Sequence, residues 1–313
     1  AAILEMHAQK KYSPADISAI GIAYQMHGSV MVDKDQQVLR NSIIWCDSRA
    51  VALGDKAFED IGKEKCLQEL LNSPGNFTAS KLAWVKQNEP DVYEKADKIM
   101  LPGDFIAMKL TGEITTSIAA LSEGVFWDFK QNELSKDVFN YYGLNKELIP
   151  QVKNVFEAHG ELKKEVAEKL TLKAGIPVSY KAGDQPNNAL SLNVLQPGEV
   201  AATAGTSGVI YGVSDELTFD KESRVNSFAH VNYKADNKKI GVLLCINGTG
   251  ILNRWIKNLA GDNISYQQMN EAAASVAAGS DGLMIFPFGN GAERMLNNKI
   301  PGALINNIDL NKH

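Results

Sequence analysis

The sequence predicts an α/β fold of two domains, with additional helices inserted between the strands. Three short apolar runs have the length and composition of buried strands, and amphipathic helical patterns lie between them. These runs are 17–24, 98–101 and 178–182. After the turn signal Gln196-Pro197-Gly198, strand-like runs followed by helical patterns begin again. We therefore predict a first domain over 1–196 and a second domain over 197–313.

The elements of the first domain follow from local patterns. Residues 1–10 have the pattern of the end of an amphipathic helix. Two runs, Val30–Asp33 and Gln37–Trp45, are joined by the polar turn 34–36 and predict a β-hairpin. Helical periodicity predicts helices over 48–60, 64–71, 79–88, 103–110, 135–142 and 161–170.

The second domain has a similar succession of patterns, without a repeat at the level of residues. Its strand-like runs are 199–204, 208–213, 240–246 and 283–287. Its helical patterns are 249–259 and 266–278. The resemblance between the halves is therefore one of architecture only.

The composition of the 313 residues, 44% hydrophobic and 22% charged, is that of a globular protein. The net charge of −5 arises from interspersed charges, so a nucleic-acid partner is not expected. No apolar run approaches the roughly 18 residues that a membrane span needs, so no membrane association is expected. Cys46, Cys66 and Cys245 form no C-x-x-C pair, which favours buried thiols over disulfides or a zinc site.

The turn Gly205-Thr206-Ser207-Gly208 lies between two strand-like runs. Its glycines permit a positive φ and a close approach of the backbone, and its N–H groups and two hydroxyls can bind phosphate. An ordinary hairpin turn is the alternative, and the four residues alone favour it. Familiar nucleotide signatures are absent. The P-loop signature G-x-x-x-x-G-K-[ST] does not occur. Gly248-Thr249-Gly250 has the first two glycines of the dinucleotide-binding signature G-x-G-x-x-G, but Asn253 occupies the position of the third.

Asp184 follows Ala182-Gly183 at the predicted carboxyl end of a strand, which is the edge where α/β sheets bind ligands. A carboxylate there can accept the proton of a hydroxyl nucleophile during phosphoryl transfer. The alternative is an N-cap of the helix that starts near Gln185. Taken alone, the position favours the cap, although the two roles are compatible.

Three further segments combine a functional interpretation with an ordinary structural one. Gln25-Met26-His27-Gly28 ends a strand, and its polar groups suit the hydroxyls of a sugar, whereas a lone histidine is more often structural. Trp45–Arg49 precedes a helix, with Asp47 as its candidate cap. Asn76–Pro90 is predicted as a plain amphipathic helix, with Lys81 extending toward solvent.

Taken together, these segments resemble the FGGY carbohydrate kinases in order and content, and within them the members that act on xylulose. The segments that carry the resemblance are Gln25–Gly28, Trp45–Arg49, Phe77–Val85, Gly183-Asp184 with Gly205–Gly208, and Phe286-Pro287-Phe288 through Glu293-Arg294. Phe77–Val85 is similar to the first family signature. Asp184 and the Gly205–Gly208 turn are similar to the catalytic aspartate and the phosphate-binding turn of the family.

The resemblance implies a ribonuclease H-like (actin-like ATPase) fold of two domains, with mixed sheets flanked by helices. It implies transfer of the γ-phosphate of ATP, with Mg²⁺, to the terminal 5-hydroxyl of D-xylulose, with Asp184 as general base. The implied sugar-binding residues are Met26, His27, Asp184 and Gln185. The implied phosphate- and nucleotide-binding residues are Gly205, Thr206, Ser207, Gly248 and Thr249. No metal ligand is assigned.

The sequence also departs from the family pattern. Gln185 stands where the family usually has Asn, and Asn76 stands where the first signature commonly has Gly. The N-terminal Asp-x-Gly-Thr strand pair and the later adenine-binding glycines are not found. We therefore expect an internal piece of a longer kinase, incomplete at both ends and inactive by itself. The implied metabolic role predicts a cytoplasmic location, and a homodimer is left open.

Two alternatives remain. The first is another substrate of the same family, such as L-ribulose, L-xylulose or glycerol. The second is a non-catalytic actin-like module that binds a sugar or a nucleotide and serves assembly or regulation.

Overall fold

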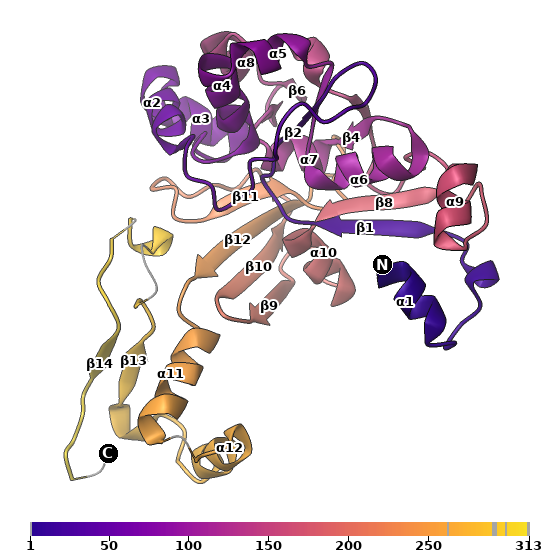
Figure 1. The fold of residues 1–313 in the computed structure, drawn as a ribbon. Coiled ribbons are helices and arrows are strands. Elements are labelled where there is room, and N and C mark those ends of the chain that lie inside the picture. Colours follow the sequence, from indigo (N-terminus) through magenta and orange to yellow (C-terminus); the bar gives the residue numbers. More distant parts are fainter. Residues whose placement is uncertain (1, 262, 290–292, 298, 312–313) are drawn as a thin grey trace.

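Two parallel strands, β1 (Ile20–Tyr24) and β8 (Val178–Gly183), lie at the centre of the first half. The structure is a computed structural model that describes residues 2–261, 263–289, 293–297 and 299–311. The register of the two strands pairs Tyr24 with Gly183, so both strands end at the same edge. In Figure 1 they point toward the middle of the molecule, where α10 (Asp184–Ser191) begins. Such an edge is a common position for a ligand site.

Short strands and helices surround this pair (Figure 1). The strand pairs are β2 (Val30–Val32) with β3 (Lys98–Met100), β4 (Thr115–Ser117) with β7 (Gln151–Lys153), and β5 (Trp127–Asp128) with β6 (Glu133–Leu134). The helices are α1 (Ala2–Ala8), α2 (Val51–Ile61), α3 (Lys63–Leu70), α4 (Thr78–Asn88), α5 (Pro90–Lys95), α6 (Pro102–Thr111), α7 (Ile118–Glu123), α8 (Lys136–Tyr142) and α9 (Lys164–Leu170).

A four-stranded antiparallel sheet forms the centre of the second half, in the order β11–β12–β10–β9. Its strands are β9 (Val200–Ala204), β10 (Gly208–Ser214), β11 (Asn226–Ala229) and β12 (Ile240–Ile246). Helix α10 packs against β8, β9 and β10 and so joins the two sheets. Beyond this sheet lie α11 (Gly250–Ala260), α12 (Tyr266–Ala274) and the antiparallel pair β13 (Met284–Phe286) and β14 (Leu304–Asn306) (Figure 1).

The largest hydrophobic cluster contains residues from both halves. Phe228 of β11 belongs to the same cluster as Leu82 and Phe126. A buried pair of hydrogen bonds strengthens this contact, because the side chain of Asn72 donates to the carbonyl of Ser227 at 2.6 Å and accepts from its N–H at 3.1 Å. The domain boundary after residue 196 therefore stays a prediction.

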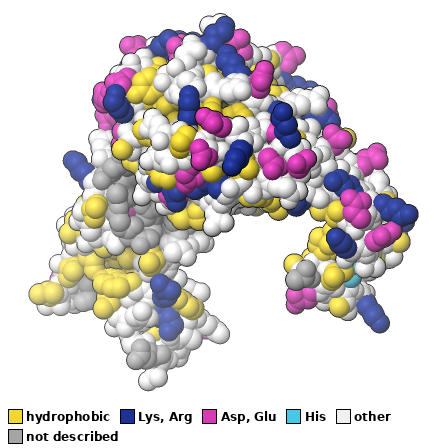
Figure 2. Space-filling view, turned by 45° about the horizontal axis from the view of Figure 1, so that its top comes forward, with side chains coloured by type: hydrophobic (Ala, Val, Ile, Leu, Met, Phe, Trp, Pro, Cys, Tyr) yellow, Lys and Arg dark blue, Asp and Glu magenta, His cyan; other side chains and the backbone are white. Residues whose placement is uncertain are grey.

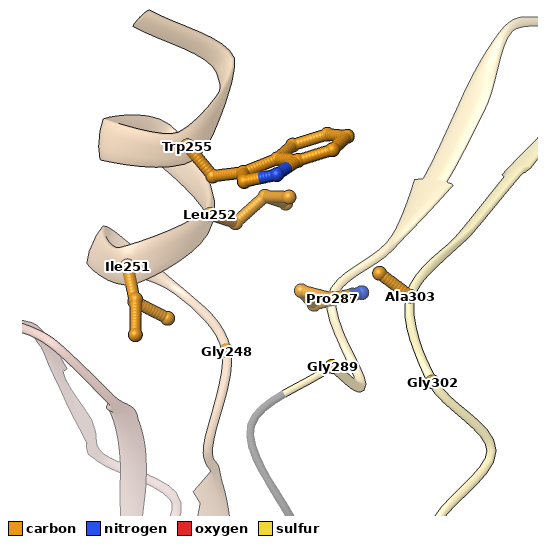
Figure 3. Close-up of a pocket in the computed structure, with 8 residues that line it drawn as sticks. All are labelled: Gly248, Ile251, Leu252, Trp255, Pro287, Gly289, Gly302 and Ala303. Atoms are coloured by element: carbon orange, nitrogen blue, oxygen red, sulfur yellow. The ribbon is translucent and has the colours of Figure 1, made fainter. Parts of the chain in front are cut away.

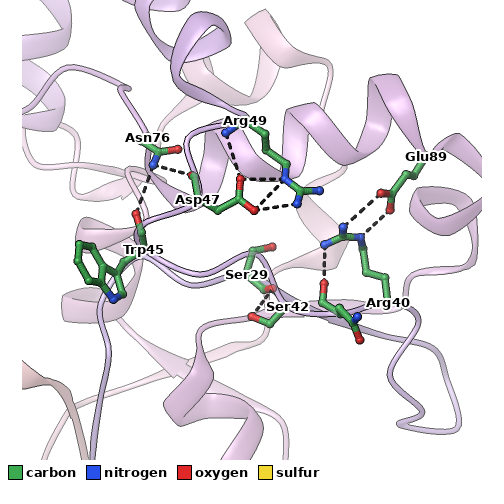
Figure 4. Close-up of polar contacts among 9 residues, drawn as sticks. Ser29, Arg40, Ser42, Trp45, Asp47, Arg49, Asn76 and Glu89 are labelled. Carbon is green, nitrogen blue, oxygen red and sulfur yellow. Dashed lines mark hydrogen bonds and ion pairs between the residues drawn. The ribbon is translucent and has the colours of Figure 1, made fainter.

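Most predicted elements are confirmed, but the second arm of the predicted hairpin is wrong. Residues 37–45 form no strand and make only isolated bridges, at Val38 and Ile43. Strand β2 pairs with β3 instead. In the middle of the arm, the guanidinium of Arg40 is 2.5 Å from a carboxylate oxygen of Glu89 (Figure 4). The ion pair attaches the arm to Glu89, the residue between α4 and α5, while the pairing of the arm with β2 is limited to the bridge between Val32 and Val38.

Sequence patterns missed the shortest elements, among them α5, α7, β4–β7, β11 and β14. All of these have six residues or fewer, which is too short to establish a period of 2 or 3.6. Predicted helix ends were also displaced. Helix α9 begins at Lys164 rather than at residue 161, and α12 ends at Ala274 rather than at residue 278.

The surface shows charges of both signs interspersed over the upper part of the face in Figure 2. Apolar side chains gather instead over the part that contains α11, α12, β13 and β14. Trp255, Leu259 and Leu304 of this part are 45%, 64% and 58% exposed. None of the described helices has the length and apolar character that crossing a bilayer requires.

Candidate active site

Asp184 lies where β8 passes into α10. It is the first residue of that helix, and Gly183 takes the cap position, so the alternative role of Asp184 as N-cap is wrong. Its Oδ1 accepts from the backbone N–H of Gln185 at 3.0 Å, and its Oδ2 accepts from the Gln185 side-chain amide at 3.4 Å. Burial raises the pKa of the Asp184 carboxyl. This shift brings the carboxyl closer to the pH range in which general bases work.

Met26 and His27 follow β1 at the same edge. A methyl group on Gly183 would lie only 2.6 Å from Cγ of Met26, so the segments that follow β1 and end β8 are in close contact. Met26 is buried, whereas His27, Asp184 and Gln185 are half-buried. The structure thus brings the four predicted sugar-binding residues to one strand edge.

His27 is held in a fixed orientation. Its φ of 61° lies in the left-handed region, which a non-glycine residue seldom adopts. Its Nδ1 is 2.9 Å from the carbonyl oxygen of Glu123 and donates to it, so Nε2 of the neutral ring is the acceptor. The ring packs against Phe77 and Phe228, at centroid distances of 4.7 and 5.4 Å. Burial lowers the pKa of His27 to about 3, which keeps the ring neutral.

Lys81 supports this histidine from α4. The prediction that it extends toward solvent is wrong, because Lys81 is fully buried and its Nζ donates to the carbonyl oxygen of His27 at 2.7 Å. Burial lowers the pKa of Lys81 to about 8. On the same helix, the ring of Trp84 lies 4.7 Å from the guanidinium carbon of Arg49. This cation–π contact links two of the segments that carry the family resemblance.

The segment around Asp47 forms a second link between those two segments (Figure 4). Asp47 pairs with Arg49 at 2.7 Å, and α2 begins only at Val51, so its predicted cap role is wrong. Asn76 donates to the carbonyl oxygens of Asp47 at 2.8 Å and of Trp45 at 3.3 Å. The first family signature commonly has glycine at position 76, and a glycine could not make these hydrogen bonds. Asn76 therefore stabilises the local structure in a way that the usual residue cannot.

The Gly205–Gly208 turn packs against the loop before α11. The Gly250 N–H and the Thr249 hydroxyl both donate to the carbonyl oxygen of Gly205, at 2.8 and 3.0 Å. A methyl group on Gly208 would lie 2.5 Å from Cγ2 of Thr249. Neither Gly205 nor Gly208 has a positive φ. The close packing of the Thr249 side chain, rather than a left-handed conformation, is therefore what favours glycine at position 208.

This contact brings together the two segments that contain the five predicted phosphate- and nucleotide-binding residues, which are Gly205, Thr206, Ser207, Gly248 and Thr249. Thr206 is exposed and Ser207 is half-exposed. Their hydroxyl-bearing side chains are of the type that can bind phosphate oxygens. Helix α10, which starts at Asp184, packs against the two strands that this turn connects.

A cavity of ≈ 400 Å³ lies beside Gly248 (Figure 3). It is lined by Gly248, Ile251, Leu252, Trp255, Pro287, Gly289, Gly302 and Ala303. A methyl group on Gly248 would lie 1.6 Å from the carbonyl oxygen of Pro287, so glycine is required at this wall. The mostly apolar lining can accept a flat or apolar group next to the predicted phosphate-binding residues.

Glu293 and Arg294, from the last segment of the resemblance, contact two loops beside the four-stranded sheet, one after β12 and one between β10 and β11. Glu293 is fully buried, and its carboxylate accepts from the N–H of Asn247 at 3.3 Å. Arg294 donates to the carbonyl and the hydroxyl of Ser223 at 2.7 and 3.0 Å, and burial lowers its pKa to about 10. Residues 290–292, which precede this pair, lie outside the described residues.

Sequence reasoning missed three charged residues beneath the site. Lys181 of β8 pairs with Asp104 of α6 at 2.6 Å, and both side chains are 1% exposed. Glu123 of α7 is also buried and accepts from the Tyr24 hydroxyl at 2.6 Å. A signal was present, because Lys181 interrupts a strand-like run and Glu123 is the only charge in the apolar segment 118–127.

The described residues include no cluster of three His, Cys, Asp or Glu side chains that could hold a metal ion. Kinases commonly hold Mg²⁺ through one or two carboxylates and the phosphates of the substrate.

Comparison with known proteins identifies the family. Residues 1–191 match the N-terminal domain of the FGGY family of carbohydrate kinases. The xylulose kinase of Haemophilus influenzae is 30% identical over 285 residues, which cover 90% of this chain and 56% of that protein. The xylulose kinase of Bacillus subtilis is 29% identical over 295 residues, which cover 92% of this chain and 57% of that protein. The chain thus spans little more than half the length of these curated relatives.

Solved structures share the fold. A structure described as a xyloylose kinase from Brucella ovis is 25% identical, with a TM-score of 0.83 over 99% of this chain and 62% of that chain. A ligand-bound xylulose kinase from Lactobacillus acidophilus is 21% identical, with a TM-score of 0.85 over the same shares. These neighbours confirm the predicted actin-like, ribonuclease H-like fold. The chain therefore belongs to the FGGY family of carbohydrate kinases.

Proposed function

We propose that the protein is an ATP-dependent sugar kinase that phosphorylates the terminal 5-hydroxyl of D-xylulose, with Asp184 as general base. The observation that carries the proposal is the meeting of His27 with Asp184 and Gln185 at one strand edge. Asp184 and Gln185 begin helix α10, which packs against the strands of the Gly205–Gly208 turn. The choice of D-xylulose rests on the xylulose kinase relatives. The proposed setting is the cytoplasm.

In the proposed reaction, Asp184 accepts the proton of the sugar hydroxyl. The hydroxyl oxygen forms a bond to the γ-phosphorus of ATP as the bond from that phosphorus to the β–γ bridging oxygen breaks, and ADP leaves. His27 and Gln185 orient the sugar through hydrogen bonds. Thr206 and Ser207 bind phosphate oxygens, and Mg²⁺ bound with ATP would neutralise charge on the phosphates. Closure of the two halves would exclude water from the reacting groups.

The first test replaces the proposed base in the complete protein. Asp184→Ala should lower kcat on the order of a thousandfold while calorimetry still detects sugar binding, because a general base acts in the transition state. Asp236→Ala, at an exposed position, is the matched control and should retain the parent kcat. Unchanged turnover of Asp184→Ala would rule out the proposed base.

The second test concerns the substrate and the chain itself. A coupled assay should show the highest kcat/KM with D-xylulose among D-xylulose, L-xylulose, L-ribulose and glycerol. Turnover only with a polyol would reject D-xylulose.

We also propose that the 313-residue chain alone is inactive, since it spans 56% of the H. influenzae relative. ATP-dependent phosphorylation of D-xylulose by this chain would contradict that part.

A further inference from the structure

Glu123 lies at the end of α7, directly under the candidate active site. The helix is capped by the hydroxyl of Ser117, which accepts from the N–H of Ala120 at 3.2 Å, and Gly124 is its C-cap. Glu123 is 2% exposed. A carboxyl so deeply buried needs partners or must stay neutral, because an isolated buried charge is costly.

Three contacts join Glu123 to the ends of both central strands. Its Oε1 accepts from the hydroxyl of Tyr24, the last residue of β1, at 2.6 Å. Its Oε2 borders β8, because a methyl group on Gly183 would lie 2.9 Å from it. Its carbonyl oxygen accepts from Nδ1 of His27 at 2.9 Å. Glu123 is therefore the residue at which the β1 end, the β8 end and the predicted sugar-binding histidine meet.

The other polar features of the carboxyl indicate a neutral acid. Oε2 is buried without a hydrogen-bond partner among the described residues. Burial raises the pKa of Glu123 well above its ordinary value; the negative charges of Asp104 and Asp184 raise it further, while the hydrogen bond from Tyr24 lowers it. A neutral Glu123 adds no second negative charge beside Asp184.

We infer that Glu123 is a positioning residue, whose carboxyl accepts a hydrogen bond from the end of β1 and packs against the end of β8, and thereby sets the orientation of Asp184. The inference rests on the proposed role of Asp184 as general base. Gly183, the residue of β8 that Oε2 borders, directly precedes Asp184, so a displacement at Gly183 passes directly to the base. The backbone carbonyl of Glu123 orients His27 separately, and a side-chain substitution leaves that contact in place.

The test separates positioning from mere packing by following Asp184 itself. Glu123→Gln keeps the shape and the hydrogen bond to Tyr24, whereas Glu123→Leu keeps most of the volume and loses that bond. Glu165→Gln is the exposed control. With ¹³C-labelled aspartate, the Asp184 signal is assigned by its loss in Asp184→Asn, and its titration midpoint is measured in each variant.

Glu123→Leu should shift the Asp184 midpoint by on the order of half a pH unit or more, because the surroundings of the carboxyl change. Glu123→Gln and Glu165→Gln should keep the parent midpoint. A folded Glu123→Leu with an unshifted midpoint would overturn the inference, and so would a Glu123→Gln shift of equal size. If Glu123→Leu does not fold, Tyr24→Phe removes the same hydrogen bond with less disturbance, and an unshifted midpoint there has the same meaning.

Kinetics of the complete protein give a second readout. Glu123→Leu should lower kcat between about tenfold and a hundredfold, because small displacements of a reacting group have effects of this size. The sugar KM should change little, and Glu123→Gln should restore most of kcat. A raised KM with parent kcat would overturn the inference. If the parent phosphorylates no sugar, the proposed function fails, and the titration still decides the role of Glu123.

Discussion

Helices α4 and α11 each have eleven residues, yet they lie in opposite surroundings. Helix α4 buries seven residues, which are Thr78, Ala79, Ser80, Lys81, Leu82, Ala83 and Val85. Helix α11 buries none, although Ile251, Leu252, Trp255 and Leu259 form a one-sided apolar pattern. The more amphipathic helix is thus the more exposed one. Burial here is decided by the neighbours of a helix rather than by its own pattern.

Lysine residues show the same contrast between a buried and an exposed environment. In the interior, Lys181 and Lys81 are enclosed by protein. Lys181 donates to the carbonyl oxygen of Thr115, and Lys81 donates to that of His27. On α11, Lys257 lies 5.6 Å from the ring centroid of Tyr266 and is partly exposed. A lysine in the interior should therefore affect stability far more than a lysine on α11. Three predictions test how far this contrast extends.

The largest effect is expected at the buried ion pair. Lys181→Met should lower the free energy of unfolding by about 3–5 kcal/mol, because it leaves the Asp104 carboxylate buried without its counter-ion. Lys257→Met is the matched change on α11 and should alter the free energy of unfolding by no more than about 0.5 kcal/mol. Denaturant unfolding measures both. The double variant Lys181→Met/Asp104→Leu should recover much of the loss, and a double variant no more stable than Lys181→Met would contradict this explanation.

The next effect concerns two leucines on the compared helices. Leu82→Ala should cost about 2–5 kcal/mol, because Leu82 is fully buried in the main core and its removal leaves a cavity. Leu259→Ala should cost no more than about 0.5 kcal/mol, because that side chain is 64% exposed. Equal losses in thermal or denaturant unfolding would show that α11 is covered in solution, and the comparison would then need revision.

The smallest effect is a dependence on pH. Lys81 has its pKa lowered to about 8 in the folded state, whereas an unfolded lysine titrates near 10.4. Between these values the unfolded chain binds more protons, so the free energy of unfolding rises with pH. From pH 7 to pH 9 the contribution of Lys81 should rise by on the order of 1 kcal/mol. Lys81→Met should lack this rise, and parallel pH profiles would contradict the assignment.

The sequence was sufficient to predict which segments form much of the site, but not which residues of those segments contact one another. The sequence placed Asp184 after a strand and identified Gly205–Gly208 as a turn, because both lie beside strong local signals. It could not show that Lys81 is buried under His27, since an amphipathic pattern normally directs lysine to solvent. Nor could it show Glu123 against Gly183, because that contact joins positions sixty residues apart.

The sequence by itself determined the α/β class, most helices and strands, and the segments that carry the family resemblance. Periodicity and turn residues act over a few neighbouring positions, so a single chain displays them directly. Only the tertiary structure decided which residues are buried, which strand pairs with β2, and which carboxyl lies beneath the base. Those outcomes depend on packing between distant segments, where burial and desolvation set the charge state of Glu123, Lys81 and His27.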